Sequence, residues 1–180
     1  MNKSLRTLIF ISLLAAILSI TSPLSFNVGA VPITLATFMI YLIGGITKKA
    51  NGVFSVLLYI VIGIIGVPVF SNFRGGISVI LGPTGGFIIG YLPMVLIISL
   101  MTSIDKTKIY WYIISMILST IVCYLCGTIW FMINTSTSFV NSLMICVVPF
   151  IIFDVIKMFI ATIVSYVLNT KMNFEERFGI

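Results

Sequence analysis

Long apolar runs dominate the chain, and short polar or glycine-rich connections separate them. A membrane-spanning helix needs about 20 mostly apolar residues, and six segments approach that length. They are residues 5–21, 33–46, 52–67, 84–102, 109–133 and 142–168. The pattern therefore predicts an all-α integral membrane protein in which residues 1–180 form a single membrane domain, a bundle of six transmembrane helices.

The composition agrees with this pattern. Hydrophobic residues make up 60% of the 180 residues and charged residues only 8%, whereas about a quarter of the residues of a soluble domain are charged. The net charge of +6 does not indicate nucleic-acid binding, because the basic residues lie scattered between apolar runs and form no stripe.

The positions of lysine and arginine predict the orientation, because cytoplasmic loops carry an excess of both. If the N-terminus is inside, six crossings leave one cation, Arg74, on the outer side. The cations placed inside are Lys3, Arg6, Lys48, Lys49, Lys106, Lys108, Lys171 and Arg177. We therefore expect a multi-pass protein of a bacterial-type cell membrane, with both termini on the cytoplasmic side. The first apolar run resembles a secretory signal, but no clean small-residue cleavage site follows it, so we expect it to stay as a helix.

A glycine-rich break interrupts the apolar pattern at residues 66–90. It holds seven of the 14 glycines and two of the six prolines. Irregular backbone in a membrane is tolerated where it lines a cavity or packs inside protein, and Arg74 adds a cation with no neighbouring carboxylate. We therefore expect a ligand to approach the backbone here. The run from Gly82 to Gly86 lacks the lysine of a P-loop, so nucleotide binding is not indicated.

Asp154 and Lys157 are the charges that lie well within a predicted span. They are three residues apart and share a helix face with Phe150, Ala161 and Ser165. That face should point into the bundle. Ionisable residues inside a membrane indicate a functional site, and a self-neutralising structural ion pair is the alternative.

By the predicted topology, Arg74, Asp154 and Lys157 converge on one outward-facing pocket. Aromatic residues such as Phe70, Phe73 and Tyr91 could supply its apolar walls. Such a pocket suits a small anion with an apolar body and a hydrogen-bonding head.

The residue types in the chain disfavour enzyme functions. The chain has no histidine, which removes Ser–His and Cys–His machinery and His-bearing metal sites. A single carboxylate lies within a span, so no aspartyl dyad forms. The three cysteines, Cys123, Cys126 and Cys146, lie in apolar surroundings and are expected to pack. We expect no catalytic residue, metal or cofactor, and no ATP-binding motif is present to power transport.

Small residues recur at four-residue spacing in the first apolar run: Ser12 with Ala16, and Ala15 with Ser19. Such faces let helices approach closely in lipid. They indicate either a partner-docking face or ordinary packing within the bundle.

Three sequence blocks together resemble the BioY family, the biotin-binding S components of energy-coupling factor (ECF) transporters. The resemblance covers almost the whole chain, and the middle block is the most specific. The blocks are Val31-Pro32-Ile33-Thr34-Leu35; Gly66-Val67-Pro68-Val69-Phe70 with Gly75-Gly76 and Gly82-Pro83-Thr84-Gly85-Gly86; and Pro149-Phe150 with Asp154 and Lys157. The chain departs from the family pattern at Ala36, where glutamine is frequent, and at Ile152-Phe153, where Pro-Gly is common.

The resemblance implies six helices with cytoplasmic ends and biotin bound near the outer face. It also implies a partner module of one membrane coupling subunit and two ATPases, with the first helix docking on the coupling subunit through Ser12, Ala15, Ala16 and Ser19. The implied ligand-binding residues are Pro32, Thr34, Phe70, Phe73, Arg74, Gly82, Pro83, Thr84, Gly85, Gly86, Tyr91, Asp154 and Lys157.

We therefore expect a high-affinity biotin-binding subunit of a vitamin importer. The ureido N–H groups of biotin would bind Asp154, and its carboxylate would bind either Arg74 or Lys157. The alternative is a self-sufficient secondary transporter of a small organic anion or another vitamin, with Asp154 as a proton site.

Overall fold

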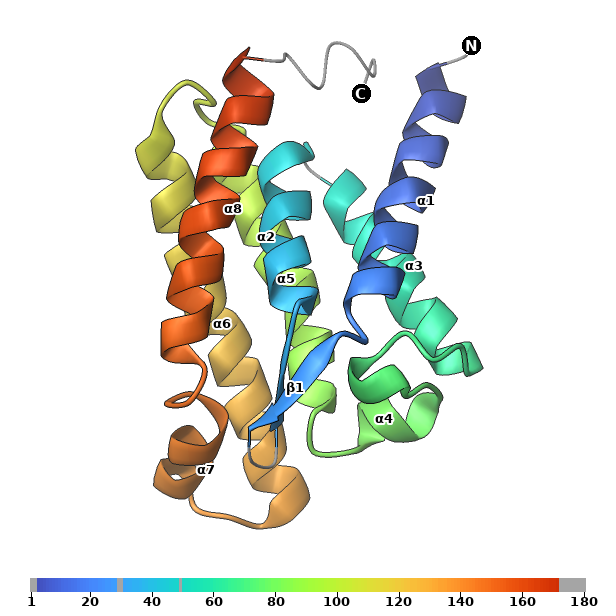
Figure 1. Cartoon of the computed structure of the whole chain (residues 1–180), viewed down its shortest axis with the longest axis vertical. Coiled ribbons are helices and arrows are strands. Elements are labelled where there is room, and N and C mark those ends of the chain that lie inside the picture. The colour runs from blue at the N-terminus through green and yellow to red at the C-terminus, as the bar shows by residue number, and fades with distance from the viewer. Residues whose placement is uncertain (1–2, 29–30, 49, 172–180) are drawn as a thin grey trace.

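The computed structural model describes residues 3–28, 31–48 and 50–171, which form a helical bundle with a small hairpin at one end (Figure 1). The main helices are α1 (Lys3–Thr21), α2 (Ala36–Ile46), α3 (Asn51–Ile65), α5 (Gly85–Thr102), α6 (Ile109–Thr135) and α8 (Ile151–Lys171). The shorter elements are β1 (Ser25–Val28), β2 (Val31–Thr34), a 3₁₀ turn η1 (Ser71–Phe73), α4 (Ile77–Leu81) and α7 (Phe139–Cys146).

Four of the described helices, α1, α5, α6 and α8, are long and apolar enough to cross a membrane. Helices α2 and α3 are equally apolar, but they have 11 and 15 residues. At 1.5 Å per residue they are about 17 and 23 Å long, short of a hydrocarbon core of about 30 Å. The predicted helical membrane architecture is confirmed, with four candidate spans and two shorter apolar helices.

The predicted second helix, 33–46, begins later than expected, because Ile33 and Thr34 belong to strand β2. This strand pairs antiparallel with β1, with Ser25 opposite Thr34. Alternate residues of a strand point to opposite faces, and Val31 and Ile33 are both buried, each 5% exposed. The hairpin is therefore an amphipathic cover on the bundle, which an all-α prediction did not include.

The predicted segment 142–168 is also divided. Helix α7 ends at Cys146 and α8 begins at Ile151, with a turn containing Pro149 between them. Proline removes a helical hydrogen bond and its ring clashes with the preceding turn. The break places Asp154 in the first turn of α8.

Helix α3 ends at Ile65, two residues before the predicted boundary of 67, because a glycine in the left-handed conformation follows it. Gly66 has φ = 117°, and the N–H of Val67 reaches back to the carbonyl oxygen of Ile62 at 3.3 Å. This is the usual geometry of a glycine-terminated helix. It turns the chain toward η1 and α4 at the end of the bundle.

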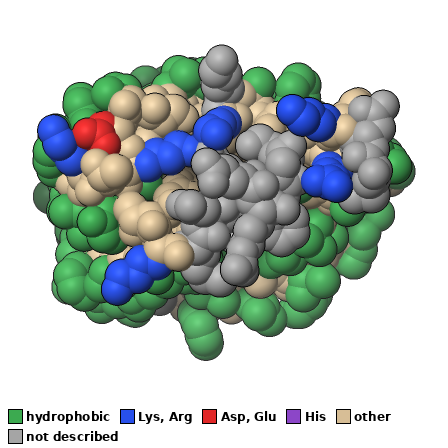
Figure 2. Space-filling model, turned by 90° about the horizontal axis from the view of Figure 1, so that it is seen from above, with side chains coloured by type: hydrophobic (Ala, Val, Ile, Leu, Met, Phe, Trp, Pro, Cys, Tyr) green, Lys and Arg blue, Asp and Glu red, His purple; other side chains and the backbone are tan. Residues whose placement is uncertain are grey.

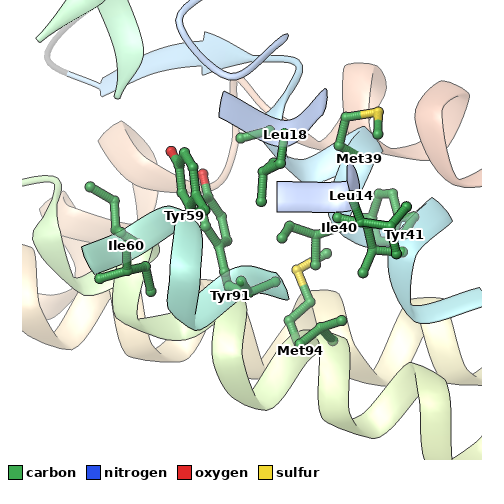
Figure 3. Packing of buried hydrophobic residues seen from close by; sticks show 14 of the residues in the cluster. Leu14, Leu18, Met39, Ile40, Tyr41, Tyr59, Ile60, Tyr91 and Met94 are labelled. Atoms are coloured by element: carbon green, nitrogen blue, oxygen red, sulfur yellow. The ribbon is translucent and has the colours of Figure 1, made fainter. Parts of the chain in front are cut away.

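The core lies where α1, α2, α3 and α5 meet. Helix α2 packs against α5 and α8, and α1 packs mainly against α3. Figure 3 shows side chains from all four helices in this core: Leu14, Leu18, Met39, Ile40, Tyr41, Tyr59, Ile60, Tyr91 and Met94. Large aliphatic residues such as Leu8, Ile9 and Leu13 of α1 remain exposed on the outside, as expected of a surface that faces lipid.

The first and last described residues lie at the same end of the bundle (Figure 1). Figure 2, seen from that end, shows lysine and arginine side chains around its face. The described cations on the segments that reach this end are Lys3, Arg6, Lys48, Lys106, Lys108 and Lys171, whereas Arg74 lies between η1 and α4 at the opposite end. Lys49 and Arg177, also predicted to lie on the terminal side, are outside the described residues.

Candidate ligand-binding site

A cavity of about 610 Å³, its open mouth included, lies in the half of the bundle away from the termini. Its walls come from the end of α1, strand β2, the loop after α3, and helices α2, α3, α5, α6 and α8. Five of the main helices, α2, α3, α5, α6 and α8, therefore contribute to one hollow, together with Ser22 just after α1.

A buried ion pair forms the charged part of the cavity wall. The Nζ atom of Lys157 lies 3.0 Å from Oδ1 of Asp154, and the two side chains are only 12% and 5% exposed. The shared helix face predicted from their spacing is confirmed, since Phe150, Ala161 and Ser165 are buried with them. The pair points into the bundle, away from lipid.

Lys157 uses all three of its N–H donors within the protein. Besides Asp154, it donates to the carbonyl oxygen of Thr34 at 2.8 Å and to the hydroxyl of Thr37 at 3.0 Å. An ammonium group has three donors and no acceptor. Its hydrogen-bonding capacity is therefore filled.

Asp154 retains one free acceptor position. Its Oδ1 accepts from Lys157 and from the hydroxyl of Thr37 at 3.2 Å, and its Oδ2 accepts from the hydroxyl of Tyr124 at 2.6 Å. A carboxylate has about four lone-pair sites, so one remains on Oδ2. The positive end of the α8 dipole also favours a negative charge in the first helical turn.

Aromatic side chains form the apolar wall. Phe70 is fully buried and meets Tyr59 edge to face, with 5.6 Å between the ring centroids. Gly63 makes room for this ring, because a Cβ at that position would overlap it. Figure 3 shows Tyr59 and Tyr91 side by side, with their hydroxyls toward the same side, and the Tyr59 hydroxyl is 2.6 Å from that of Ser22.

The structure brings together many of the predicted ligand-binding residues. Those that line the cavity are Pro32, Thr34, Phe70, Thr84, Tyr91, Asp154 and Lys157. Phe73 does not line it and is 65% exposed. Gly85 and Gly86 are buried, and a Cβ on them would overlap the carbonyl group of Ile80 and the side chain of Trp130. The two glycines therefore permit close packing of protein against protein, where we expected contact with a ligand.

Arg74 does not share the cavity of Asp154 and Lys157. With Gly82 and Pro83 it lines a second hollow, and Thr84 borders both. The cause is the tight loop around η1, in which the N–H of Phe70 bonds to the carbonyl oxygen of Arg74 at 2.9 Å. This closure holds Phe70 buried and Arg74 exposed. The predicted single pocket is therefore two adjoining hollows.

Several residues that line the cavity were not predicted, among them Ser22, Thr37, Tyr59 and Tyr124. For Tyr124 a signal was present, because the small and polar residues of α6 recur on one face and are buried: Ser115, Ser119, Thr120 and Cys123. Tyr124 lies beside that face. Ser22 lies in the connection after the first apolar run, and Thr37 and Tyr59 lie on apolar segments. Nothing in their spacing indicates a binding role.

The two small-residue pairs of α1 have different surroundings. Ala15 is fully buried in the bundle and Ser19 is partly buried, with its hydroxyl donating to the carbonyl oxygen of Ala15 at 2.8 Å. Ser12 and Ala16 are exposed. The predicted docking role therefore does not suit Ala15, whose side chain faces its own bundle because α1 packs on α3 through that side.

Apolar helices that enclose an aromatic cavity with one charged pair define a membrane protein that binds a small molecule. Comparison with known proteins narrows this class. The BioY family matches residues 1–174, so the chain belongs to the BioY family, as the sequence blocks predicted.

Individual relatives agree along nearly the whole chain. The biotin transporter BioY2 of Lactococcus lactis subsp. cremoris (strain MG1363) is 33% identical over 177 residues, which cover 98% of this chain and 97% of the relative. The biotin transporter BioY of Thermotoga maritima is 31% identical over 162 residues, or 89% and 94% of the two chains. The crystal structure of the S-component for biotin from an ECF-type ABC transporter superposes with a TM-score of 0.85, covers 93% of each chain and is 26% identical.

The buried pair leads to a first prediction. Lys157→Met should lower the free energy of unfolding by about 3–5 kcal/mol, because it leaves the Asp154 carboxylate buried and uncompensated. Asp154→Asn should also destabilise the protein, and the double variant should lose less than the sum of the two. Denaturation of the purified protein in one fixed detergent measures all three.

Lys108→Met is the matched control. Its partner Asp105 lies 3.6 Å away, with side chains 55% and 33% exposed, and surface pairs contribute about 0–1 kcal/mol. The Thr107 hydroxyl and N–H also bond to Asp105 at 2.6 and 3.0 Å and lower the pKa of that carboxyl, so Asp105 keeps partners without Lys108. A loss for Lys157→Met no larger than for Lys108→Met would contradict the assigned role of the pair.

Proposed function

We infer that this chain is a biotin-binding S component of an ECF transporter. The observation that carries the inference is the cavity with its Asp154–Lys157 pair, in a fold that superposes over 93% of the chain on an S-component for biotin. Family membership and relatives named as biotin transporters support the same ligand.

The chemistry of the cavity suits biotin. The free acceptor position on Oδ2 of Asp154 matches a ureido N–H, and a charge-assisted hydrogen bond of this kind is stronger than a neutral one. The rings of Tyr59, Phe70 and Tyr91 offer an apolar surface to the thioether ring. Small-molecule sites typically bind one end of the ligand through a few polar groups, which set the specificity, and contact the rest of the ligand through apolar side chains.

The orientation in the membrane is a further part of the proposal. Both termini lie in the cytoplasm and the cavity opens to the outside of the cell membrane, because described cations surround the terminal end of the bundle. Six segments cross, with α2 and α3 as the short crossings. Strand β2 before α2 and the loop after α3 complete their lengths, since irregular backbone is tolerated at membrane depth when it packs inside protein.

The chain takes up biotin only together with an energising module. That module consists of a membrane coupling subunit and two ATPases, and this chain supplies the binding site. The absence of an ATP-binding motif from the sequence supports this division of labour. The exposed Ser12 and Ala16 of α1 form the docking face for the coupling subunit.

Calorimetry of the purified protein tests the ligand. Biotin should bind with one site per chain in the absence of ATP and added metal, whereas thiamine and riboflavin should not bind. Selective binding of one of those vitamins would overturn biotin as the ligand and leave the fold unaffected.

Two tryptophan substitutions on α1 test the docking face. Ala16→Trp should reduce co-purification of the coupling subunit and biotin uptake at least about tenfold, because a large side chain prevents close helix approach. Its biotin affinity and melting temperature should stay near those of the unmodified protein.

Ala15→Trp is the comparison. It overpacks the bundle and should cost about 1–3 kcal/mol of stability. The docking assignment is wrong if Ala16→Trp retains normal uptake, or if it destabilises the protein as much as Ala15→Trp does.

A further inference from the structure

A third hollow lies between the β1–β2 hairpin and the first turns of α8. It measures about 710 Å³, its open mouth included, and is lined by Leu24, Phe26, Ile33, Thr34, Leu35, Phe153 and Lys157. The N–H of Leu35 donates to the carbonyl oxygen of Leu24 at 3.2 Å, which joins the two ends of the hairpin into one wall. We name this space the hairpin hollow.

The hairpin hollow offers little to water. Five of its lining residues are apolar, and the two polar ones, Thr34 and Lys157, use their polar atoms within the protein. Lys157 donates to the carbonyl oxygen of Thr34 at 2.8 Å, and the hydroxyl of Thr34 accepts from the N–H of Ala36 at 3.2 Å. An ordered water needs about two to four polar partners. The occupant that fits this lining is therefore apolar.

The mouth of the hairpin hollow opens on the surface that we assign to lipid. Phe26 and Phe153 at its rim are 75% and 47% exposed, and the neighbouring Ile152 and Ile156 of α8 are exposed as well. Helix α8 is a candidate membrane span, so its exposed apolar side chains meet the acyl chains of the bilayer. The hairpin hollow is thus a concave continuation of a lipid-facing surface.

The hairpin hollow also lies directly behind the charged wall of the ligand cavity, because Thr34 and Lys157 line both spaces. Water in the hairpin hollow would raise the local dielectric constant beside the Asp154–Lys157 pair, and the attraction between the two charges falls as that constant rises. An acyl chain in the same place keeps this side of the pair dry.

We propose that the hairpin hollow binds one acyl chain of a phospholipid, which seals the lipid-facing side of the Asp154–Lys157 pair. The chain packs between the hairpin and Phe153 of α8. This assignment does not depend on which ligand occupies the cavity, so it stands or falls separately from the biotin function.

Photo-labelling of the purified protein in detergent tests the proposal. The probe is a phosphatidylcholine with a diazirine on one acyl chain, and mass spectrometry locates the adducts. Labelling within residues 24–35 and 153–157 should saturate at a low mole fraction of probe in the micelle, as expected of a site. Labelling around Ile160 and Ile163, which are exposed on α8 outside the hollow, should rise in proportion to the probe.

Leu35→Trp fills the hairpin hollow with a large ring and should reduce the saturable labelling at least about fivefold. Ile160→Trp makes the same kind of change on the open face of α8 and should leave that labelling unchanged. Saturation with unlabelled phosphatidylcholine should raise the melting temperature of the unmodified protein and of Ile160→Trp more than that of Leu35→Trp, because a ligand stabilises only a protein that binds it. Leu24→Trp fills the hollow from its other wall and replaces Leu35→Trp if that variant does not fold.

Three results would overturn the acyl-chain site. The first is labelling at the hairpin hollow that rises in proportion to the probe, as it does around Ile160. The second is saturable labelling and lipid stabilisation that both filling variants retain in full. The third is a stable dimer in which the hollow is protected from the probe, which would assign the hollow to a second copy of the chain.

Discussion

A carboxylate removed from water in the middle of a membrane protein requires compensation, and the pairing of Asp154 with Lys157 supplies it. An unpaired ion in such surroundings costs several kcal/mol. The compensation here involves four elements: Thr34 from β2, Thr37 from α2, Tyr124 from α6 and the pair itself on α8. The same contacts that satisfy the charge therefore fix the hairpin and three helices around the cavity.

The glycine-rich segment works mainly through close packing. Gly63, just before it in α3, admits the ring of Phe70, and Gly66 turns the chain with a positive φ. Gly86 allows α5 to lie directly on Trp130 of α6, and the indole N–H of that residue donates to the carbonyl oxygen of Gly82 at 2.9 Å. Irregular backbone is thus hydrogen-bonded within protein, as the membrane environment requires. The result is a closely packed wall for a site whose charged pair comes from α8.

Much of this architecture follows from the sequence, because apolar run length and charge position are local properties. The helical segments, the shared face of Asp154 and Lys157 and the family resemblance were all readable in this way. The hairpin was missed because strands Ser25–Val28 and Val31–Thr34 are four residues each and lie mostly in a short connection between two apolar runs. The break at Pro149 was present in the sequence but was read as the interior of one long helix.

Other features depend on tertiary contacts and were beyond the reach of the pattern. Arg74 and Asp154 are on the same side of the predicted topology, yet they line different hollows. The loop closed by the hydrogen bond from Phe70 to Arg74 leaves Arg74 exposed. Ala15 and Ala16 are neighbours in sequence, and only the packing of α1 on α3 decides which of them is buried.

The central claim is that Asp154 receives the ureido ring of biotin and that Lys157 stays bonded to its partners in the protein. A crystal structure of the protein with biotin bound tests this most directly, because it shows both ends of the ligand at once. The account predicts a ureido nitrogen at about 3 Å from Oδ2 of Asp154, with the Lys157 contacts to Thr34 and Thr37 intact. A carboxylate bonded to Lys157, with the ureido ring at the mouth of the cavity, would contradict it.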